Sequence, residues 1–318
     1  MTANSFNTGV SAFNDFSDWI VDPDPQDNRL HLGCGFEHVR IAPESVTLLG
    51  GMPGAGKTAL IMQWVITTME ADPSLKTLIA NVEMSPRELL SRQLARLSDT
   101  PLTSIRERRV GQQDKDRLNA GMDRLEPLCE RLTFLDAPFS MSNVVATATE
   151  TEARLIVLDY VQRFDPFDDS PDKRQAISSV MGTLRQMAKH GAAVIVLSSL
   201  SRSRDGRGRA TYEADSMTLA SFKESGDLEY GADDALLLCP QSNSNLVDLR
   251  HEKSRYGERR DLLLDFDRPH QSFSVVCAGT SNAADPTSAE RPTPARCSSA
   301  TSPEILARLH AARARSES

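Results

Sequence analysis

Eight consecutive residues have the types and spacing that bind phosphate, and they read Gly51-Met52-Pro53-Gly54-Ala55-Gly56-Lys57-Thr58. Glycines let backbone N–H groups curl around an anion without steric conflict, and the first turn of a following helix adds partial positive charge. In such a loop we expect Lys57 to reach the β- and γ-phosphates of a nucleotide and the hydroxyl of Thr58 to ligate Mg²⁺. The alternative is a Gly-rich turn of no function, which the predicted strand before it and helix after it disfavour.

Two acidic residues follow apolar runs and complete the chemistry that a phosphate loop needs. Asp159 ends the run Leu155–Leu158, and a carboxylate at the carboxyl end of a strand points into the crevice where α/β sheets bind ligands. There it can hold Mg²⁺, directly or through water; the alternative is a residue that caps the next turn. Glu83 follows the run Thr77–Val82, and hydrolysis requires a base that orients water. A simple acid at a helix entry is its alternative role.

These residues need a sheet with helices on both faces to hold them. Apolar runs without alternation, separated by segments of helical periodicity, predict parallel strands buried on both sides. A helix is predicted from Ser85, because Ser85 and Glu88 have capping-box spacing and Pro86 fits the first helical position. The predicted strands are Ser45–Leu49, Lys76–Val82, Leu132–Leu135, Leu155–Leu158, Ala193–Leu197, Ala235–Leu238, Leu246–Leu249 and Leu262–Phe266. The last three lack helices between them, so we expect them to extend a mostly parallel α/β sheet with antiparallel strands at its C-terminal edge.

Composition limits the classes of protein. The 318 residues carry a net charge of −8, which disfavours a surface coated in positive charge and, at first sight, a nucleic-acid partner. No apolar run reaches the roughly 18 residues of a membrane span, and the first residues lack the pattern of a signal peptide. The five cysteines are scattered without metal-site spacing, as is typical of reduced thiols. We therefore expect a cytoplasmic protein with no membrane partner.

The chain divides into three zones. Residues 1–38 are polar with a few aromatic side chains, and residues 39–278 hold the predicted strands and helices. Residues 279–318 are rich in Ala, Ser, Thr and Pro, which predicts a disordered tail that contains a short basic helix. One nucleotide-binding domain with flexible ends is therefore expected, rather than two domains.

Taken in order, these motifs resemble the C-terminal ATPase domain of DnaB-type replicative helicases. The resemblance covers about Leu30 to Val276, and several short motifs in series are more specific than a phosphate loop alone. The motifs are Gly51–Thr58, Asn81–Ser85 with Glu88–Leu90 and Arg92, Leu155–Gln162, Val194–Arg202, Phe222–Gly226 with Ala232–Asp233, and Lys253–Gly257.

The resemblance implies a RecA-like fold in a hexameric ring, with ATP and Mg²⁺ between subunits. Glu83 then resembles the catalytic base and Asp159 the Walker B acid that completes the metal site. Arg255 resembles an arginine finger that reaches the γ-phosphate held by the neighbouring subunit, and Lys253 lies beside it. Without the resemblance, Lys253 and Arg255 have the character of a solvated, charged strand end.

The resemblance also implies single-stranded DNA as a partner, with a helicase loader or primase as further ones. Lys223, Glu224 and Gly226 match the loop that follows DNA phosphates in the channel of the ring. Arg202 and Arg204 belong to an Arg- and Gly-rich segment that suits either a second channel loop or an ordinary surface loop.

The chain departs from the family pattern in three places. Ser199 stands where the family usually has a Gln that senses the γ-phosphate, so coupling to DNA is expected to be weak or rerouted. Lys223 replaces an Arg, which keeps the charge and loses bidentate geometry. Residues 1–38 offer no room for the family's N-terminal domain; Phe6, Val10, Phe13, Trp19 and Ile20 suggest a linker helix that docks on an adjacent subunit or on its own domain.

The leading functional hypothesis is an ATP-dependent DNA helicase that couples hydrolysis at subunit interfaces to translocation on single-stranded DNA in replication. One alternative is a RecA/RadA- or KaiC-like ATPase that acts in recombination or protein remodelling. The other is a scaffold that associates with a helicase and does not hydrolyse ATP.

Overall fold

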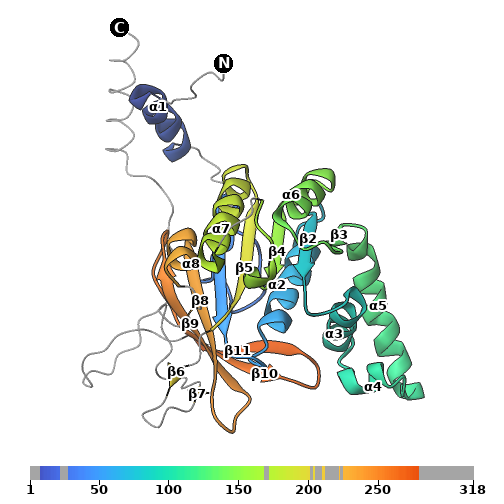
Figure 1. Cartoon of the computed structure of the whole chain (residues 1–318). Helices are drawn as coiled ribbons and strands as arrows, with labels where there is room; N and C mark the ends of the chain where they lie inside the picture. The colour runs from blue at the N-terminus through green and yellow to red at the C-terminus, as the bar shows by residue number, and fades with distance from the viewer. Residues whose placement is uncertain are drawn as a thin grey trace, which may run out of the picture. The chain divides into compact units, whose positions relative to one another are not determined.

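The computed structural model describes residues 8–21, 28–167, 172–200, 203–204, 210–211, 222 and 225–278 (Figure 1). These residues fall into two units: the helix α1 (Gly9–Ile20), and a main unit that begins at Arg29. Leu32 and Phe36 are buried in the core of the main unit, so the stretch just before residue 39 contributes to that core. The tail after residue 278, with its expected basic helix, lies outside the described residues.

A nine-stranded sheet runs through the main unit in the order β11-β10-β9-β8-β1-β5-β4-β2-β3. Its strands are β1 (Val46–Gly51), β2 (Thr77–Asn81), β3 (Leu132–Phe134), β4 (Leu155–Asp159), β5 (Ala193–Ser199), β8 (Asp234–Pro240), β9 (Leu246–Ser254), β10 (Leu262–Asp267) and β11 (Ser272–Ala278). All pairings from β8 through β1 to β3 are parallel, and those between β8, β9, β10 and β11 are antiparallel. The predicted α/β class, with antiparallel strands at the C-terminal edge, is confirmed.

One detail of the predicted sheet is wrong, because β8 pairs parallel with β1 rather than antiparallel. The short helix α8 (Ser225–Gly231) precedes β8 and lets the chain return to the amino end of the sheet before the strand begins. Neither α8 nor β11 was predicted from the sequence. Within α8, Leu228 is a buried apolar side chain flanked by polar residues, so no helical periodicity marks the segment.

Helices cover both faces of the sheet, and successive residues of each central strand enter different cores. On one face Leu49 and Val157 pack in a cluster with α2 and α3, and on the other Leu48 and Ile156 pack in a cluster with α6 and α7. The remaining helices and short elements are α2 (Lys57–Ala71), α3 (Pro86–Ser98), α4 (Leu102–Arg106), α5 (Lys115–Cys129), α6 (Met141–Glu150), α7 (Lys173–Lys189), the 3₁₀ turns η1 (Gln112–Asp114) and η2 (Val161–Arg163), and the strand pair β6 (Ser203–Arg204) with β7 (Ala210–Thr211).

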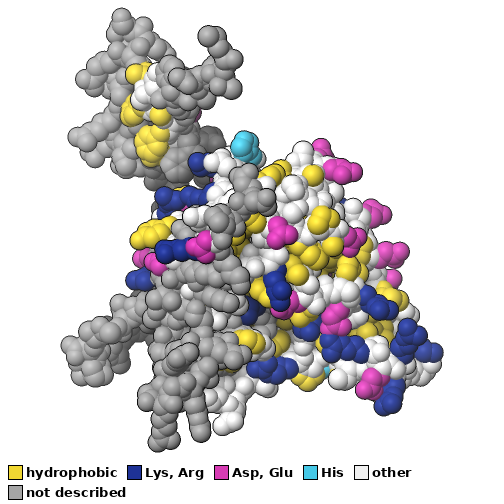
Figure 2. Space-filling model, viewed as in Figure 1, with side chains coloured by type: hydrophobic (Ala, Val, Ile, Leu, Met, Phe, Trp, Pro, Cys, Tyr) yellow, Lys and Arg dark blue, Asp and Glu magenta, His cyan; other side chains and the backbone are white. Residues whose placement is uncertain are grey.

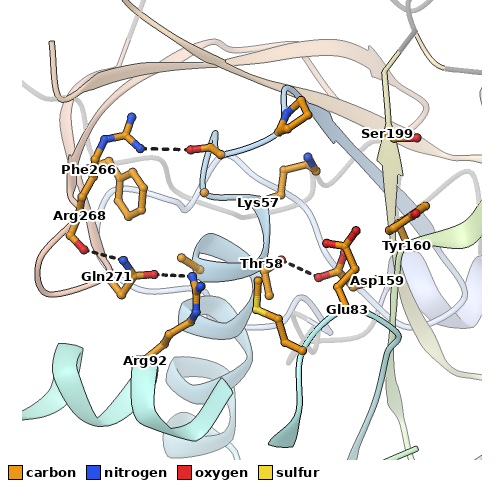
Figure 3. Close-up of a pocket in the computed structure, with 15 residues that line it drawn as sticks. Lys57, Thr58, Glu83, Arg92, Asp159, Tyr160, Ser199, Phe266, Arg268 and Gln271 are labelled. Carbon is orange, nitrogen blue, oxygen red and sulfur yellow. Dashed lines mark hydrogen bonds between the residues drawn. The ribbon is translucent and has the colours of Figure 1, made fainter. Parts of the chain in front are cut away.

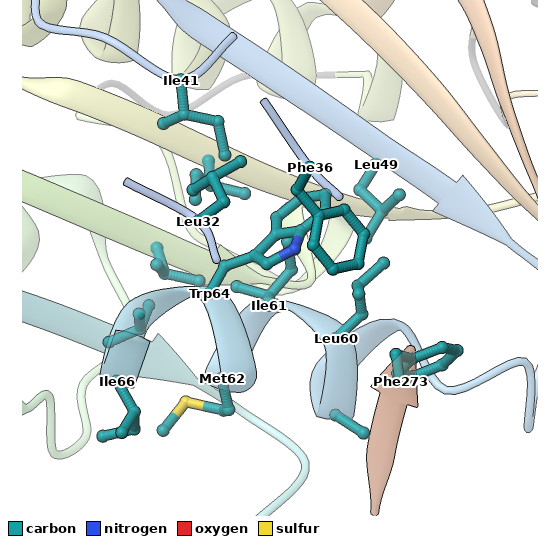
Figure 4. Packing of buried hydrophobic residues seen from close by; sticks show 14 of the residues in the cluster. Leu32, Phe36, Ile41, Leu49, Leu60, Ile61, Met62, Trp64, Ile66 and Phe273 are labelled. Carbon is teal, nitrogen blue, oxygen red and sulfur yellow. The ribbon is translucent and has the colours of Figure 1, made fainter. Parts of the chain in front are cut away.

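Helix α2 is the element that carries the phosphate loop into the core. Its Trp64 is fully buried and meets the ring of Phe36 edge-on, with 5.4 Å between ring centroids (Figure 4). Such edge-to-face pairs of buried rings add to the stability that their burial already provides. Helix α2 is therefore fixed in the core of the main unit, and the phosphate loop leads directly into this fixed helix.

Helix α3 begins as its sequence predicts. The Ser85 hydroxyl accepts a hydrogen bond from the backbone N–H of Glu88, and Pro86 occupies the first helical position. The Glu88 carboxylate pairs with the guanidinium groups of Arg92 and Arg106. This cap fixes the point at which the chain leaves β2 and enters the helix.

The surface of the main unit mixes charges of both signs. On the face drawn in Figure 2, Lys and Arg side chains are interspersed with Asp and Glu, and no continuous basic patch covers the described residues there. Among the helices that the structure describes, none combines the length and the apolar character that crossing a bilayer requires.

Two glycine substitutions test this packing with opposite expected signs. A Cβ added to Gly50, in β1, would lie 2.7 Å from Phe222 Cζ and 2.8 Å from Leu237 Cδ2. Gly50→Ala is therefore expected to lower the free energy of unfolding by about 1–3 kcal/mol.

Gly182 is exposed within α7 with no atom within 4 Å of an added Cβ. Gly182→Ala is expected to raise the free energy of unfolding by about 0.5–1 kcal/mol, because Ala favours the helix more than Gly does. Urea unfolding of both variants is the measurement, and shifts of the same sign would contradict the packing described.

Candidate nucleotide-binding site

The phosphate loop joins the carboxyl end of β1 to the amino end of α2. Gly54 and Gly56 have φ angles of +78° and +97°, which residues with a side chain rarely adopt. A Cβ at Gly56 would also lie 2.7 Å from Phe273 Cζ and 2.8 Å from Phe266 Cε1. The glycine there is thus required both by the turn of the loop and by the aromatic pair behind it.

Lys57 folds back along its own loop. Its ammonium donates hydrogen bonds to the carbonyl oxygens of Gly51 (2.8 Å) and Met52 (3.2 Å). Burial lowers the pKa of Lys57, whereas the negative charges of Asp159 and Glu83 raise it. The amine therefore lies inside the loop, within reach of any anion that the backbone N–H groups bind.

Asp159 and Thr58 meet at the carboxyl edge of the sheet, as Figure 3 shows. The Thr58 hydroxyl donates to Asp159 Oδ2 over 2.6 Å, and the side chain of Asn81 donates to the same oxygen over 2.8 Å. Burial raises the pKa of Asp159, and the hydrogen bond from Thr58 and the charge of Lys57 oppose that shift. The carboxylate is only 4% exposed, so these donors hold its position.

The donor set fits Mg²⁺ bound together with a nucleotide. Among the described residues, no group of three or more His, Cys, Asp or Glu side chains could hold a metal ion on its own. One hydroxyl and one carboxylate suit Mg²⁺, which keeps water ligands and takes others from substrate phosphates. Thr58 and Asp159 are therefore the residues that would hold the ion.

Glu83 is exposed and lies in the turn that follows β2, next to Asp159 (Figure 3). Its backbone N–H donates to Asn81 Oδ1 over 2.9 Å, and the N–H of Met84 donates to the same oxygen over 2.7 Å. A carboxylate in this position can reach a water molecule placed beyond a phosphate held by the loop.

These residues surround one cavity of about 470 Å³. The predicted residues Lys57, Thr58, Glu83 and Asp159 all line it, and so does Ser199 at the end of β5. A cavity of this size suits a nucleotide-sized ligand. The structure thus brings together the phosphate loop, the two residues that would hold Mg²⁺ (Thr58 and Asp159) and Glu83, which the motifs predict separately.

The far wall of the cavity holds residues whose role sequence reasoning missed. Arg268, in the turn between β10 and β11, donates to the carbonyl oxygen of Gly54 over 3.1 Å and lies over the ring of Phe266. Arg92 from α3 donates to Gln271 Oε1 over 2.7 Å, and burial lowers the pKa of Arg92. Arg92 belongs to one of the motifs that carry the resemblance, but no role was predicted for it, and no local pattern marks Arg268 or Gln271.

Arg255 and Lys253 lie away from this cavity. Arg255, half-exposed, pairs with Asp233 over 2.9 Å, and the Lys253 ammonium donates to two backbone carbonyls near the end of α8. The register pairs Ser254 with Asp234 and Asp234 with Thr47, so both residues sit level with the start of β1. The phosphate loop begins at the opposite end of that strand, roughly 13 Å further at about 3.3 Å per residue.

The structure describes the predicted DNA-binding residues only in part. Gly226 lies half-buried in α8, and Arg204 pairs through its backbone with Ala210. Arg202, Lys223 and Glu224 lie outside the described residues. The residue before Lys223 is Phe222, which is buried and forms a β-bridge with Leu200 immediately after β5.

The comparison with family models defines the class of protein. Residues 40–275 match the model of the DnaB-like helicase C terminal domain. Since this match spans most of the chain, the protein belongs to that family.

Curated relatives carry related names and are longer. The replicative DNA helicase DnaB of Helicobacter pylori is 22% identical over 233 residues, which are 69% of this chain and 46% of the relative. A probable plasmid replicative DNA helicase of Chlamydia trachomatis is 23% identical over 246 residues, which are 75% of this chain and 52% of the relative. The chain therefore spans about half the length of the curated relatives it matches.

Solved structures agree on the fold. A DnaB-like replicative helicase, described with its interactions with primase, has a TM-score of 0.67 at 20% identity and matches 85% of this chain and 67% of its own. A solved ATPase domain has the same TM-score of 0.67 at 21% identity, covering 83% of this chain and 95% of its own. The RecA-like ATPase fold predicted from the motifs is confirmed.

A lysine substitution tests the phosphate loop. Lys57→Ala is expected to weaken ATP binding at least tenfold, or about 1.4 kcal/mol, because the ammonium that faces the anion is lost. Isothermal titration with ATP and Mg²⁺ measures the affinity. Lys76→Ala is the matched control, since Lys76 pairs with Glu152 on the surface away from the cavity. Equal affinities for the two variants would remove Lys57 from the site.

Proposed function

We propose that the protein is an ATP-dependent DNA helicase motor, which hydrolyses ATP between subunits and moves along single-stranded DNA in replication. The observation that carries the proposal is that the proposed catalytic residues lie at opposite ends of the strands. The phosphate loop, Asp159 and Glu83 share a cavity at the carboxyl ends, while Arg255 lies level with the start of β1. A subunit of this kind completes its site only against a neighbour, as in a ring.

The arrangement supports hydrolysis as follows. The loop N–H groups and Lys57 bind the phosphates, and Glu83 orients the attacking water. Thr58 and Asp159 would hold Mg²⁺, which would supply positive charge that stabilises the phosphates. Arg255 of the next subunit stabilises charge on the γ-phosphate in the transition state, so that turnover depends on assembly.

The DNA side of the proposal rests on sequence and on one contact. Lys223, Glu224 and Gly226, with Arg202 and Arg204, would follow the phosphates of a single strand in the channel. The bridge between Leu200 and Phe222 supports this, because it anchors the start of the predicted loop beside the strand end that carries Ser199. Positive charge is needed only where the strand passes, so a net charge of −8 does not oppose it.

The helix α1 supports assembly. Val10, Phe13 and Phe16 follow one another at three-residue spacing, and each is at least 42% exposed. Large apolar side chains on one helical face favour a docking surface. We therefore propose that α1 docks on an adjacent subunit as a linker helix, and that a ring of six subunits forms. A helicase loader or primase is proposed as a further partner.

ATP turnover with and without single-stranded DNA tests the function, alongside a mass measurement of the assembly. We expect a hexamer, DNA-stimulated hydrolysis and displacement of a strand from a forked duplex, with loss of the hexamer when residues 1–21 are removed. Turnover that DNA neither binds nor stimulates would favour the RecA/RadA- or KaiC-like alternative. Tight ATP binding without turnover in either condition would favour the scaffold.

Arg255→Ala tests the shared site. The variant should bind ATP and assemble, because Asp233 keeps its bonds to Arg185 and to the N–H of Val46. Its turnover should fall about 10³-fold or more, as for other arginine fingers.

Mixing two inactive variants separates action in trans from action in cis. Arg255→Ala subunits supply an intact loop and Lys57→Ala subunits an intact arginine, so mixed rings should recover part of the activity. Arg259→Ala, which removes an exposed arginine four residues away, is the control with normal turnover. Full activity of Arg255→Ala alone, or mixed rings without recovery, would exclude the finger.

A further inference from the structure

A buried asparagine lies between the two acids of the site. Asn81 ends β2, is 7% exposed, and its amide makes three hydrogen bonds. Nδ2 donates to Asp159 Oδ2 over 2.8 Å, and Oδ1 accepts from the backbone N–H groups of Glu83 (2.9 Å) and Met84 (2.7 Å). The Asn81 side chain therefore contacts both the carboxylate of Asp159 and the turn that carries Glu83, the proposed base.

The strand register creates this contact. β2 and β4 pair in parallel with Asn81 opposite Asp159, so the two side chains leave the sheet together at its carboxyl edge. The backbone N–H groups of Glu83 and Met84 only donate, so they require the amide oxygen and leave the amide nitrogen for Asp159. No carboxylate could do both, because an ionised carboxylate has no proton to donate.

The contact also determines which oxygen of Asp159 is occupied. Among the described residues, Thr58 and Asn81 donate hydrogen bonds to this carboxylate, and both bonds go to Asp159 Oδ2. Oδ1 accepts no hydrogen bond from the described residues and is the oxygen left for a ligand of the cavity that Asp159 lines. Second-shell bonds of this kind hold metal-binding carboxylates in their working orientation, and their loss typically costs about 10- to 100-fold in metal affinity or activity.

We propose that Asn81 is a positioning residue that locks Asp159 and the Glu83 turn into one rigid unit. The proposal rests on the function proposed above for the site. Asn81 does not line the cavity; it acts through Asp159 and Glu83, whose separation must suit a bound phosphate and the water that attacks it.

Two substitutions separate the hydrogen bond that Asn81 donates to Asp159 from the two that it accepts from Glu83 and Met84. Asn81→Asp keeps an acceptor for Glu83 and Met84 and removes the donor to Asp159, whereas Asn81→Ala removes both. We expect kcat for ATP without DNA to fall about 10- to 100-fold in each variant. KM should stay within threefold of the wild-type value, because Lys57 and the loop glycines are unchanged.

Hydrogen exchange supplies a readout that does not depend on turnover. In Asn81→Ala the amides of Glu83 and Met84 lose their acceptor and should exchange about tenfold faster, whereas in Asn81→Asp they should stay protected. Asn143→Ala is the matched control: its amide bridges the carbonyls of Asp136 and Pro138 outside the cavity, so kcat should not change.

Each outcome decides the proposal. Normal kcat in Asn81→Asp, or unchanged exchange in Asn81→Ala, would overturn the link between the two acids. A parallel loss of kcat and a large rise in KM would show a collapsed site instead and would also overturn it. Absence of DNA stimulation counts only against the helicase. A wild-type protein without turnover contradicts the proposed function, and exchange still decides the role of Asn81.

Discussion

The structure depends on one carboxylate that is buried at the end of a strand and held by hydrogen bonds. Asp159 is almost fully buried, and burial alone favours its neutral form. The hydroxyl of Thr58, the amide of Asn81 and the charge of Lys57 oppose that effect. They come from α2 and from β2, so the bonds to one carboxylate fix the relative positions of a helix and two strands. The phosphate loop and the turn at Glu83 follow from that arrangement, since each continues directly from one of these elements.

The change of strand direction after β8 places Arg255, the proposed arginine finger, at the opposite end of the strands from the cavity. β8 runs parallel to β1, and β9 runs back along it, so β9 ends level with the start of β1. Arg255 follows β9 and is held by Asp233, whose other partners are Arg185 from α7 and the N–H of Val46. The orientation of the Arg255 side chain is thus set by Asp233, which is itself bonded to the start of β1. The proposed role of Arg255, at this distance from the phosphate loop, favours turnover in an assembly over turnover in a monomer.

The parts of the fold and site that depend on local chemistry could be predicted from the sequence. The loop at Gly51–Thr58, the cap at Ser85 and the buried strands each carry their signal within a few residues. The direction of β8 could not be predicted, because α8 has no periodic apolar face and the strand's own residues fit either direction. Arg92 and Arg268 reach the cavity through long-range packing, and Asn81 acquires its role only from the register of β2 against β4. Patterns in the sequence indicate which strands exist, whereas pairing decides which side chains meet.

The short side chain of Ser199 predicts weak or rerouted coupling to DNA. Ser199 lines the cavity, and the amide of Gln162, three residues after Asp159, donates to Ser198 Oγ over 2.7 Å. The end of β5 is therefore tied to the segment that follows β4 without a long side chain at position 199. From there the chain passes to Leu200, which is bridged to Phe222 beside the predicted DNA loop. Contiguity alone does not transmit energy, because coupling requires an element with two arrangements that both sites bias. The end of β5 is the element that contacts both sides, since Ser199 lines the cavity and Leu200 is bridged to Phe222 beside the predicted DNA loop.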